Sequence, residues 1–200
     1  AGIIQSWQHS GNNATGASNQ VPVESQLKAL QKVVKFKRLG IVYNPREPNS
    51  RIQRHIAARL QGPMGFRLID FQIVHPADLK VVMPRLKEAV DAVFVPADSL
   101  MISLGDALAR WINRLKLPSL ATVESLVTQH GLLLGLQPSY YQLGRLTADK
   151  ARRILKGAAA TDIPSSRLEY FQMTVNMQTA RKIDIQIPIS ILVMANKIIR

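Results

Sequence analysis

Polar side chains that could bind a small molecule follow several buried strands predicted from the sequence. The candidate ligand-binding residues are Tyr43, Asn44, Asn49, Ser50, Asp98, Ser99, Thr122, Glu124 and Tyr141. Because the carboxyl ends of parallel strands meet at one edge of a sheet, beside helix N-termini, we expect these groups to gather there. Taken singly, several of them also suit helix caps. Their meeting at one edge favours a binding site for a small polar ligand.

Motifs that would indicate catalysis, a cofactor or a metal are missing from the sequence. Residues 11–16 have the G-x-x-x-x-G spacing of a phosphate loop, but Ala17-Ser18 replaces the Lys-Ser/Thr that such a loop requires. There is no G-x-G-x-x-G, G-x-S-x-G or H-E-x-x-H segment. Cysteine is absent, and metal-ligand spacing is lacking among His9, His55, His75 and His130. We therefore expect no catalytic residue, no metal and no cofactor.

The elements that must position the candidate residues are short apolar strands alternating with amphipathic helices. Strands are predicted at 38–43, 66–74, 91–95, 118–123 and 131–136. Helices are predicted at 23–36, 51–61, 76–89, 102–115 and 124–129, with a break at Pro84. The strands are continuous apolar runs, as expected when both faces of a sheet are covered. The pattern predicts the α/β class, with a three-layer αβα doubly wound parallel sheet.

The last third of the chain has a different pattern. It predicts a helix at 139–156, a strand at 171–176, a helical turn at 179–183 and a terminal helix at 187–199. A single strand cannot form a sheet of its own. We therefore expect this segment to add to a second, incomplete lobe or to a partner chain.

The charge of the chain raises nucleic acid as a partner. Lys and Arg number 26 against 13 Asp and Glu, for a net charge of +13 among 200 residues. The basic residues are spread over several predicted helices and aromatic residues make up only 6%, so no basic stripe with interleaved aromatics is formed. We interpret the charge as belonging to solvated helix faces and expect no nucleic acid partner.

Six segments, in their order and spacing, carry a resemblance to a known family. They are GNNATGAS, VYNPREPNS, VFVPADS, GLLLGLQPSYYQLGRLTADKARRILKG, IPSSRLEYFQMTVNMQTARKI and IPISIL. Together they resemble the ABC-transporter substrate-binding proteins that include the tryptophan-type binding lipoproteins of bacteria. The resemblance runs across essentially the whole chain, although Asn12 stands where the family has the second glycine of G-G-N-x-T-G.

The resemblance implies a fold and a role. The fold is that of the type I periplasmic binding proteins, in which two α/β lobes close on a ligand. The role is the extracytoplasmic solute-binding component of an ABC importer, without catalysis, located in the periplasm or anchored outside the membrane. Its partners would be an ABC permease and a small polar ligand, such as an amino acid or related metabolite, bound in a cleft at the carboxyl ends of the strands.

The resemblance also assigns roles to some of the candidate residues. The family's cleft residues fall on Tyr43, Asn44, Asn49, Ser50, Asp98 and Ser99. A helix N-terminus at Asn49 and Ser50 suits a ligand carboxylate, and Asp98 suits an ammonium group. The family usually has an acidic residue before its tyrosine pair, where this chain has Ser139. If that acid reads the amino group of the ligand, this protein prefers a different ligand.

The lobe assignment follows from the same resemblance. Residues 1–21 are expected to end the first lobe and cross over, 22–136 to form the second lobe, and 137–200 to return to the first. The family's first lobe begins with strands that precede Ala1, so we expect the chain alone to bind ligand weakly and to expose an apolar surface that suits a homodimer. The alternatives are a ligand-sensing domain of a signalling protein, since one fold serves both roles, and, less favoured, a basic nucleic-acid-binding module.

Overall fold

The computed structural model of the chain describes residues 3–200, which divide into two compact units. The smaller unit contains the described residues up to Val21 together with Pro138–Phe171, and the larger contains Pro22–Gln137 and Gln172–Arg200. From the sequence we expected all of 137–200 to return to the first lobe. In the structure Gln172–Arg200 belongs with the larger unit instead, because the strand at Phe171–Asn176 completes the sheet of that unit.

The larger unit is built on a seven-stranded sheet with the order β3-β2-β4-β5-β6-β8-β9. Its strands are β2 (Arg38–Tyr43), β3 (Arg67–Gln72), β4 (Ala92–Val95), β5 (Ser119–Ala121), β6 (Leu134–Pro138), β8 (Phe171–Asn176) and β9 (Lys197–Ile199). The pairs from β3 to β6 are parallel, as is the pair of β8 and β9. The predicted α/β class with a mostly parallel sheet is confirmed.

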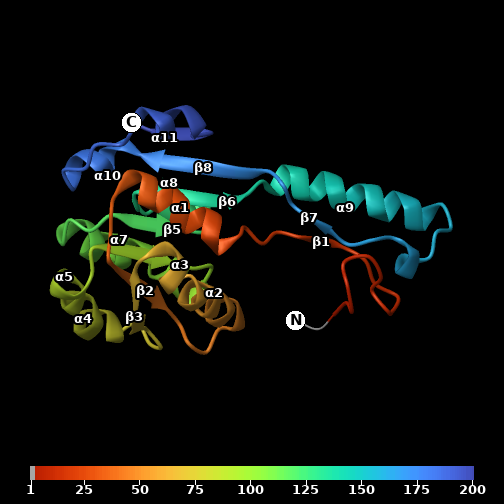
Figure 1. The fold of residues 1–200 in the computed structure, drawn as a ribbon, viewed down its shortest axis with the longest axis horizontal. Coiled ribbons are helices and arrows are strands. Elements are labelled where there is room, and N and C mark those ends of the chain that lie inside the picture. The colour runs from red at the N-terminus through yellow and green to blue at the C-terminus, as the bar shows by residue number, and fades with distance from the viewer. Residues whose placement is uncertain (1–2) are drawn as a thin grey trace. The chain divides into compact units, whose positions relative to one another are not determined.

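Helices cover both faces of this sheet, which is why its central strands are apolar throughout (Figure 1). The core on one face joins Val42, Val93 and Val95 to residues of the covering helices. Those helices are α4 (Asp78–Val82), α5 (Leu86–Ala89), α6 (Ser99–Ser103), α7 (Gly105–Arg114) and α8 (Glu124–Thr128). On the opposite face α1 (Val23–Val33) contacts β5, and α2 (Pro48–Arg59) contacts β2. The short helix α3 (Gln61–Met64) follows α2.

Proline breaks one predicted helix where expected, and a second helix divides without a proline. Pro84 lies in the 3₁₀ turn Met83–Arg85 that separates α4 from α5. The helix predicted at 102–115 begins earlier, at Ser99, because Asp98 caps it by accepting a hydrogen bond from the Met101 amide at 3.1 Å. It then divides at Leu104, which ends α6 and precedes α7.

The terminal helix predicted at 187–199 is wrong in its second half. Only α11 (Ile189–Met194) is helical, and the strand β9 follows it. Asn196 explains the change, since its amide donates to the Met173 carbonyl at 2.8 Å and its Oδ1 accepts from the Met173 amide at 2.8 Å. These two bonds hold the chain against β8. The helix α10 (Met177–Lys182) connects β8 to this segment.

Strand β8 runs back along β6. The Asn176 amide at the end of β8 donates to the Leu133 carbonyl just before β6, at 2.9 Å, and Gln137 at the end of β6 bonds Thr174 through its side chain, at 2.8 Å. Buried Met173 and Val175 complete the strand's packing. This pairing places Gln172–Arg200 in the larger unit.

The smaller unit contains a two-stranded parallel sheet and one long helix. Strand β1 (Ala17–Ser18) pairs with β7 (Ser166–Arg167), and the helix is α9 (Tyr140–Leu155). The 3₁₀ turn Ala160–Asp162 lies between α9 and β7. Lys150 is the buried residue of α9, and its Nζ donates to the Pro164 carbonyl. Ser139 caps α9 by accepting from the Gln142 amide at 3.4 Å.

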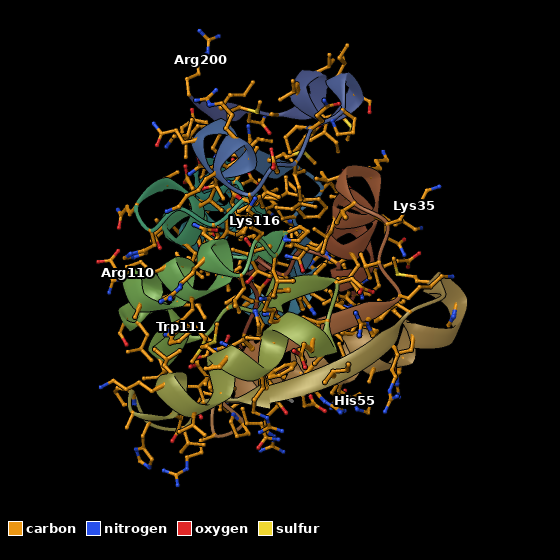
Figure 2. The ribbon with its side chains drawn as sticks, turned by 90° about the vertical axis from the view of Figure 1, so that its left-hand side faces the viewer. Lys35, His55, Arg110, Trp111, Lys116 and Arg200 are labelled. Carbon is orange, nitrogen blue, oxygen red and sulfur yellow. The ribbon has the colours of Figure 1, made fainter. Side chains whose placement is uncertain are left out.

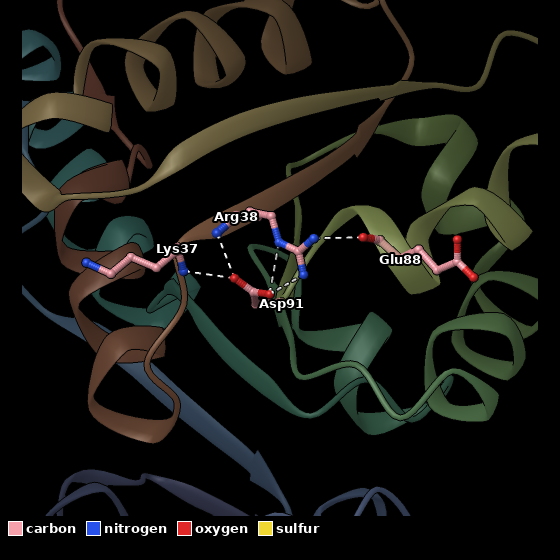
Figure 3. A network of polar contacts seen from close by, with 4 residues as sticks. All are labelled: Lys37, Arg38, Glu88 and Asp91. Carbon is pink, nitrogen blue, oxygen red and sulfur yellow. Dashed lines mark hydrogen bonds and ion pairs between the residues drawn. The ribbon is translucent and has the colours of Figure 1, made fainter.

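At the amino ends of β2 and β4, which we call the amino edge, Asp91 joins the two strands (Figure 3). Its Oδ2 accepts from the Lys37 and Arg38 amides at 2.9 and 2.8 Å, and its Oδ1 accepts from the Arg38 guanidinium at 2.7 and 3.1 Å. Arg38 also donates to the Glu88 carbonyl at 2.7 Å. The hydrogen bonds from the Arg38 side chain are the main reason that the pKa of Asp91 is lowered.

Candidate functional site

Most of the candidate residues lie at the carboxyl ends of β2, β4 and β5, which we call the carboxyl edge. Tyr43 ends β2 and is buried, with its hydroxyl 3.4 Å from Nε2 of Gln72 on β3. Burial raises the pKa of the Tyr43 phenol, and the negative charge of Asp70 adds to the effect. Tyr43 therefore forms part of the wall of the edge, with its hydroxyl facing β3.

Asp98 is the central residue of this edge and only 1% of it is exposed. Its Oδ2 accepts from the Asn44 amide at 2.7 Å and from the Ser50 hydroxyl at 2.5 Å, while its Oδ1 accepts from the Met101 amide at 3.1 Å. The carboxylate thus connects the loop after β4 to both ends of the loop between β2 and α2. It is used for bonds within the protein, whereas the resemblance assigned it to a ligand ammonium group.

Glu47 provides a second connection between the same two loops, and the sequence analysis missed it. Its Oε2 accepts from the Ser99 amide at 2.8 Å, and its Oε1 accepts from the Ser99 hydroxyl at 3.2 Å. Glu47 also precedes the first residue of α2. We call Asn44, Glu47, Ser50, Asp98 and Ser99 the loop clasp.

Two features of the sequence could have identified Glu47. An acidic residue directly before a predicted helix stabilises its N-terminus. The loop also comes from the strand neighbouring β4, so that its polar residues face those that follow β4. The two prolines around Glu47, Pro45 and Pro48, instead made the segment resemble a simple turn.

The remaining candidates are only partly brought together. Asn49 is exposed in the first turn of α2. Thr122 follows β5 and is 6% exposed, and its Oγ1 has no hydrogen-bond partner among the described residues. Glu124 is paired with Lys197 of β9, Oε1 to Nζ 2.9 Å, and so its charge is already balanced. Tyr141 belongs to α9 of the smaller unit and is 73% exposed.

Two glutamines near the carboxyl end of β6 resemble Thr122 in having an unpaired oxygen. Gln26 of α1 donates to the Leu136 carbonyl at 2.9 Å, and Gln137 donates to Thr174. The Oε1 atoms of both glutamines are buried without a partner within residues 3–200. Sequence patterns did not single them out, because the sequence does not show which side-chain atoms of a glutamine will have a hydrogen-bond partner.

A shallow hollow of about 400 Å³ lies elsewhere, on the outer face of α7, lined by Ala107, Arg110, Trp111 and Arg114. All four residues belong to this one helix. Figure 2 shows that Lys35, Arg110, Lys116 and Arg200 come from different parts of the larger unit rather than from one stripe. The hollow lacks the convergent loops and buried polar groups of the carboxyl edge.

The described residues contain neither a metal cluster nor a membrane-spanning helix. Within residues 3–200 no three His, Asp or Glu side chains are grouped to hold a metal ion. None of the helices in that range is both long enough and apolar enough to cross a membrane.

Known structures define the class of fold. The chain superimposes with a TM-score of 0.85 on a conserved domain protein of Vibrio cholerae, 24% identical, covering 98% of this chain and 66% of that one. An ABC domain in complex with L-Trp from Streptococcus pneumonia gives 0.83, with 23% identity and coverages of 98% and 68%. A ligand-free, open substrate-binding protein with adhesive properties from Clostridium difficile gives 0.83, with 24% identity and coverages of 99% and 66%. The fold is that of the periplasmic binding proteins.

The sequence identifies the family within that class. Residues 1–199 match the family of ABC transporter substrate binding proteins, and the chain belongs to it. The family is one of substrate-binding proteins. A tyrosine-binding protein of Clostridioides difficile is 26% identical over 187 residues, which are 93% of this chain and 54% of that protein. The chain thus spans about half the length of this relative.

Proposed function

We propose that this protein binds an amino acid with an aromatic side chain for an ABC importer, and that the ligand lies against the carboxyl edge. The family supports a substrate-binding role. The tyrosine-binding relative and the structure with bound L-Trp support the ligand class. An importer role implies a permease partner and a location outside the cytoplasm, in the periplasm or anchored to the membrane.

The observation that carries this proposal is the loop clasp. Ligands of open α/β sheets bind where loops at the carboxyl ends of strands meet helix N-termini. Here two such loops are fixed to each other by Asp98 and Glu47, so that the edge is held in one arrangement before a ligand arrives. A preorganised edge loses less conformational entropy on binding, which strengthens affinity.

Isothermal titration of the full natural protein that contains these 200 residues would test the proposal. The panel is the twenty amino acids, with ribose and arabinose as sugar controls. We expect L-tyrosine or L-tryptophan to bind and the sugars not to bind. A ligand at a hundred times its dissociation constant would raise the free energy of unfolding by about 2.7 kcal/mol, which thermal melting would detect. No binding to any amino acid would contradict the proposal.

The exposed residue Asn49 offers a variant that separates binding from folding. Its side chain takes part in no hydrogen bond recorded for the described residues. Asn49→Ala should therefore leave the melting temperature of the free protein unchanged and weaken ligand binding. The homodimer expected from the sequence stays a prediction, which light scattering of the purified protein would test.

A further inference from the structure

Asp98 has little capacity left to bind a ligand. An ionised carboxylate has about four positions at which it accepts hydrogen bonds. Three of them are taken by Asn44, Ser50 and Met101, and the residue is almost fully buried. A ligand ammonium group could reach Asp98 only by displacing one of these donors. Such a displacement would remove the acceptor of that donor, which is unfavourable in a buried position.

The Glu47 side chain is more exposed than that of Asp98 and accepts fewer hydrogen bonds. It is half-buried rather than buried, and it receives hydrogen bonds only from Ser99. The bond to Oε1, at 3.2 Å, is long for a hydroxyl donor, whose usual distance is about 2.7–2.8 Å. None of the ion pairs formed by the described residues includes Glu47. The Glu47 carboxylate therefore has acceptor positions to spare.

The position of Glu47 at a helix N-terminus also holds its side chain in place. It directly precedes α2, a helix of 12 residues, whose N-terminal dipole favours a negative charge. Asp98 caps the helix that begins with Ser99, and so it fixes the amide and hydroxyl that hold Glu47. Asp98 thus determines the place of Glu47 without itself facing a ligand.

We propose that Glu47 is the carboxylate that binds the ammonium group of the ligand, and that Asp98 is the positioning residue behind it. This inference rests on the proposed function, since it concerns the same edge. A charged hydrogen bond contributes about 1.5–3 kcal/mol, which corresponds to a tenfold or greater change in affinity. The ligand class that follows is an amino acid or another primary amine, rather than a neutral or anionic aromatic compound.

The test compares amino acids with analogues that lack only the amino group. L-tyrosine and 3-(4-hydroxyphenyl)propionate form one pair, and L-tryptophan and indole-3-propionate form the other. Calorimetry of the wild-type protein should show the amino acid binding at least about tenfold more tightly than its analogue. In Glu47→Gln this preference should fall to within about threefold, because the amide lacks the charge. The affinity for the analogue should not change.

Three further variants separate the roles of the carboxylates. Glu88→Gln removes an exposed carboxylate whose side chain lies outside the clasp, and it should keep the wild-type preference. Glu47→Asp retains the charge on a shorter side chain and should give an intermediate preference. This variant tests the same role if Glu47→Gln folds poorly. Asp98→Asn should lower the melting temperature of the ligand-free protein, whereas Glu47→Gln should not.

The outcomes distinguish this inference from the proposed function. If wild-type protein binds an amino acid and Glu47→Gln keeps the full preference over the analogue, Glu47 does not bind the ammonium group, although the proposed function stands. If the wild-type protein binds none of the four compounds and none of the other amino acids of the panel, the proposed function itself is wrong.

Discussion

An aspartate connects strands β2 and β4 at each of their two ends, and the two aspartates have different kinds of partner. At the amino edge Asp91 is paired with a cation, the Arg38 guanidinium, and remains partly exposed. At the carboxyl edge Asp98 is buried and accepts only from neutral donors. The charge of Asp91 is thus balanced by an adjacent cation, whereas Asp98 takes part in none of the ion pairs formed by the described residues. In the proposed complex the ammonium group of the ligand would supply the positive charge at the carboxyl edge.

Removing each aspartate should give the largest difference between the two ends. Asp98→Ala removes the acceptor of the Asn44 and Met101 amides and leaves the Ser50 hydroxyl only its 3.4 Å contact to the Ala97 carbonyl. It should lower the free energy of unfolding by about 3 kcal/mol. Asp91→Ala exposes its former partners to water and should cost about 1 kcal/mol. Urea denaturation of the two variants measures both. Equal losses would show that burial does not distinguish the two ends.

The coupling energies measured by double-mutant cycles should depend on salt at the amino edge and not at the carboxyl edge. The coupling between Arg38 and Asp91, from Arg38→Met and Asp91→Asn, should be about 1 kcal/mol in low salt and decrease in 1 M NaCl, because exposed charges are screened. The coupling between Ser50 and Asp98, from Ser50→Ala and Asp98→Asn, should not change with salt. A strong salt dependence at Ser50 and Asp98 would mean that their contact is open to solvent.

Acid should weaken the amino edge in a defined pH range. The pKa of Asp91 is lowered in the folded protein, so its stabilising effect is complete above its ordinary value of about 3.9 and is lost as the pH falls through the folded value. The stability difference between wild type and Asp91→Asn, within about 1 kcal/mol, should therefore be larger at pH 6 than at pH 2. Unfolding curves at both pH values measure it. A difference that grows on acidification would reverse the assigned sign.

The smallest effect is expected from Ser99. Ser99→Ala removes the long hydroxyl contact to Glu47 at 3.2 Å and leaves the amide bond at 2.8 Å in place. Because the lost bond is exposed, the free energy of unfolding should change by about 0.5 kcal/mol or less. Thermal melting against wild type checks this value. A loss near that of Asp98→Ala would mean that Glu47 is held as rigidly as Asp98.

Local sequence patterns predicted the elements whose boundaries are set locally. The strands at 38–43 and 171–176 have the predicted bounds, because the first is an apolar run that ends at a turn and the second alternates apolar and polar residues up to Asn176. The break at Pro84 was also predicted, since proline acts on its own helix. The ending of α11 was missed because Asn196 bonds Met173, which is 23 residues away along the chain.

The candidate site shows the same limit. The sequence predicted which strand ends carry polar groups, and the structure places Asn44, Ser50, Asp98 and Ser99 together. It could not show that Asp98 accepts hydrogen bonds from Asn44 and Ser50, about 50 residues earlier in the chain, or that Lys197 balances Glu124 across 73 residues. Which polar groups remain free depends on such long-range pairs.

The chain passes between its two units three times, after Val21, after Gln137 and after Phe171. This connectivity affects synthesis on the ribosome. Strands β2 to β6 and their helices form one continuous stretch, so this part of the larger unit can begin to fold as it emerges. The smaller unit must wait, because β1 finds its partner β7 only after about 150 further residues have been made. A slow late step in refolding should therefore report on the pairing of β1 with β7.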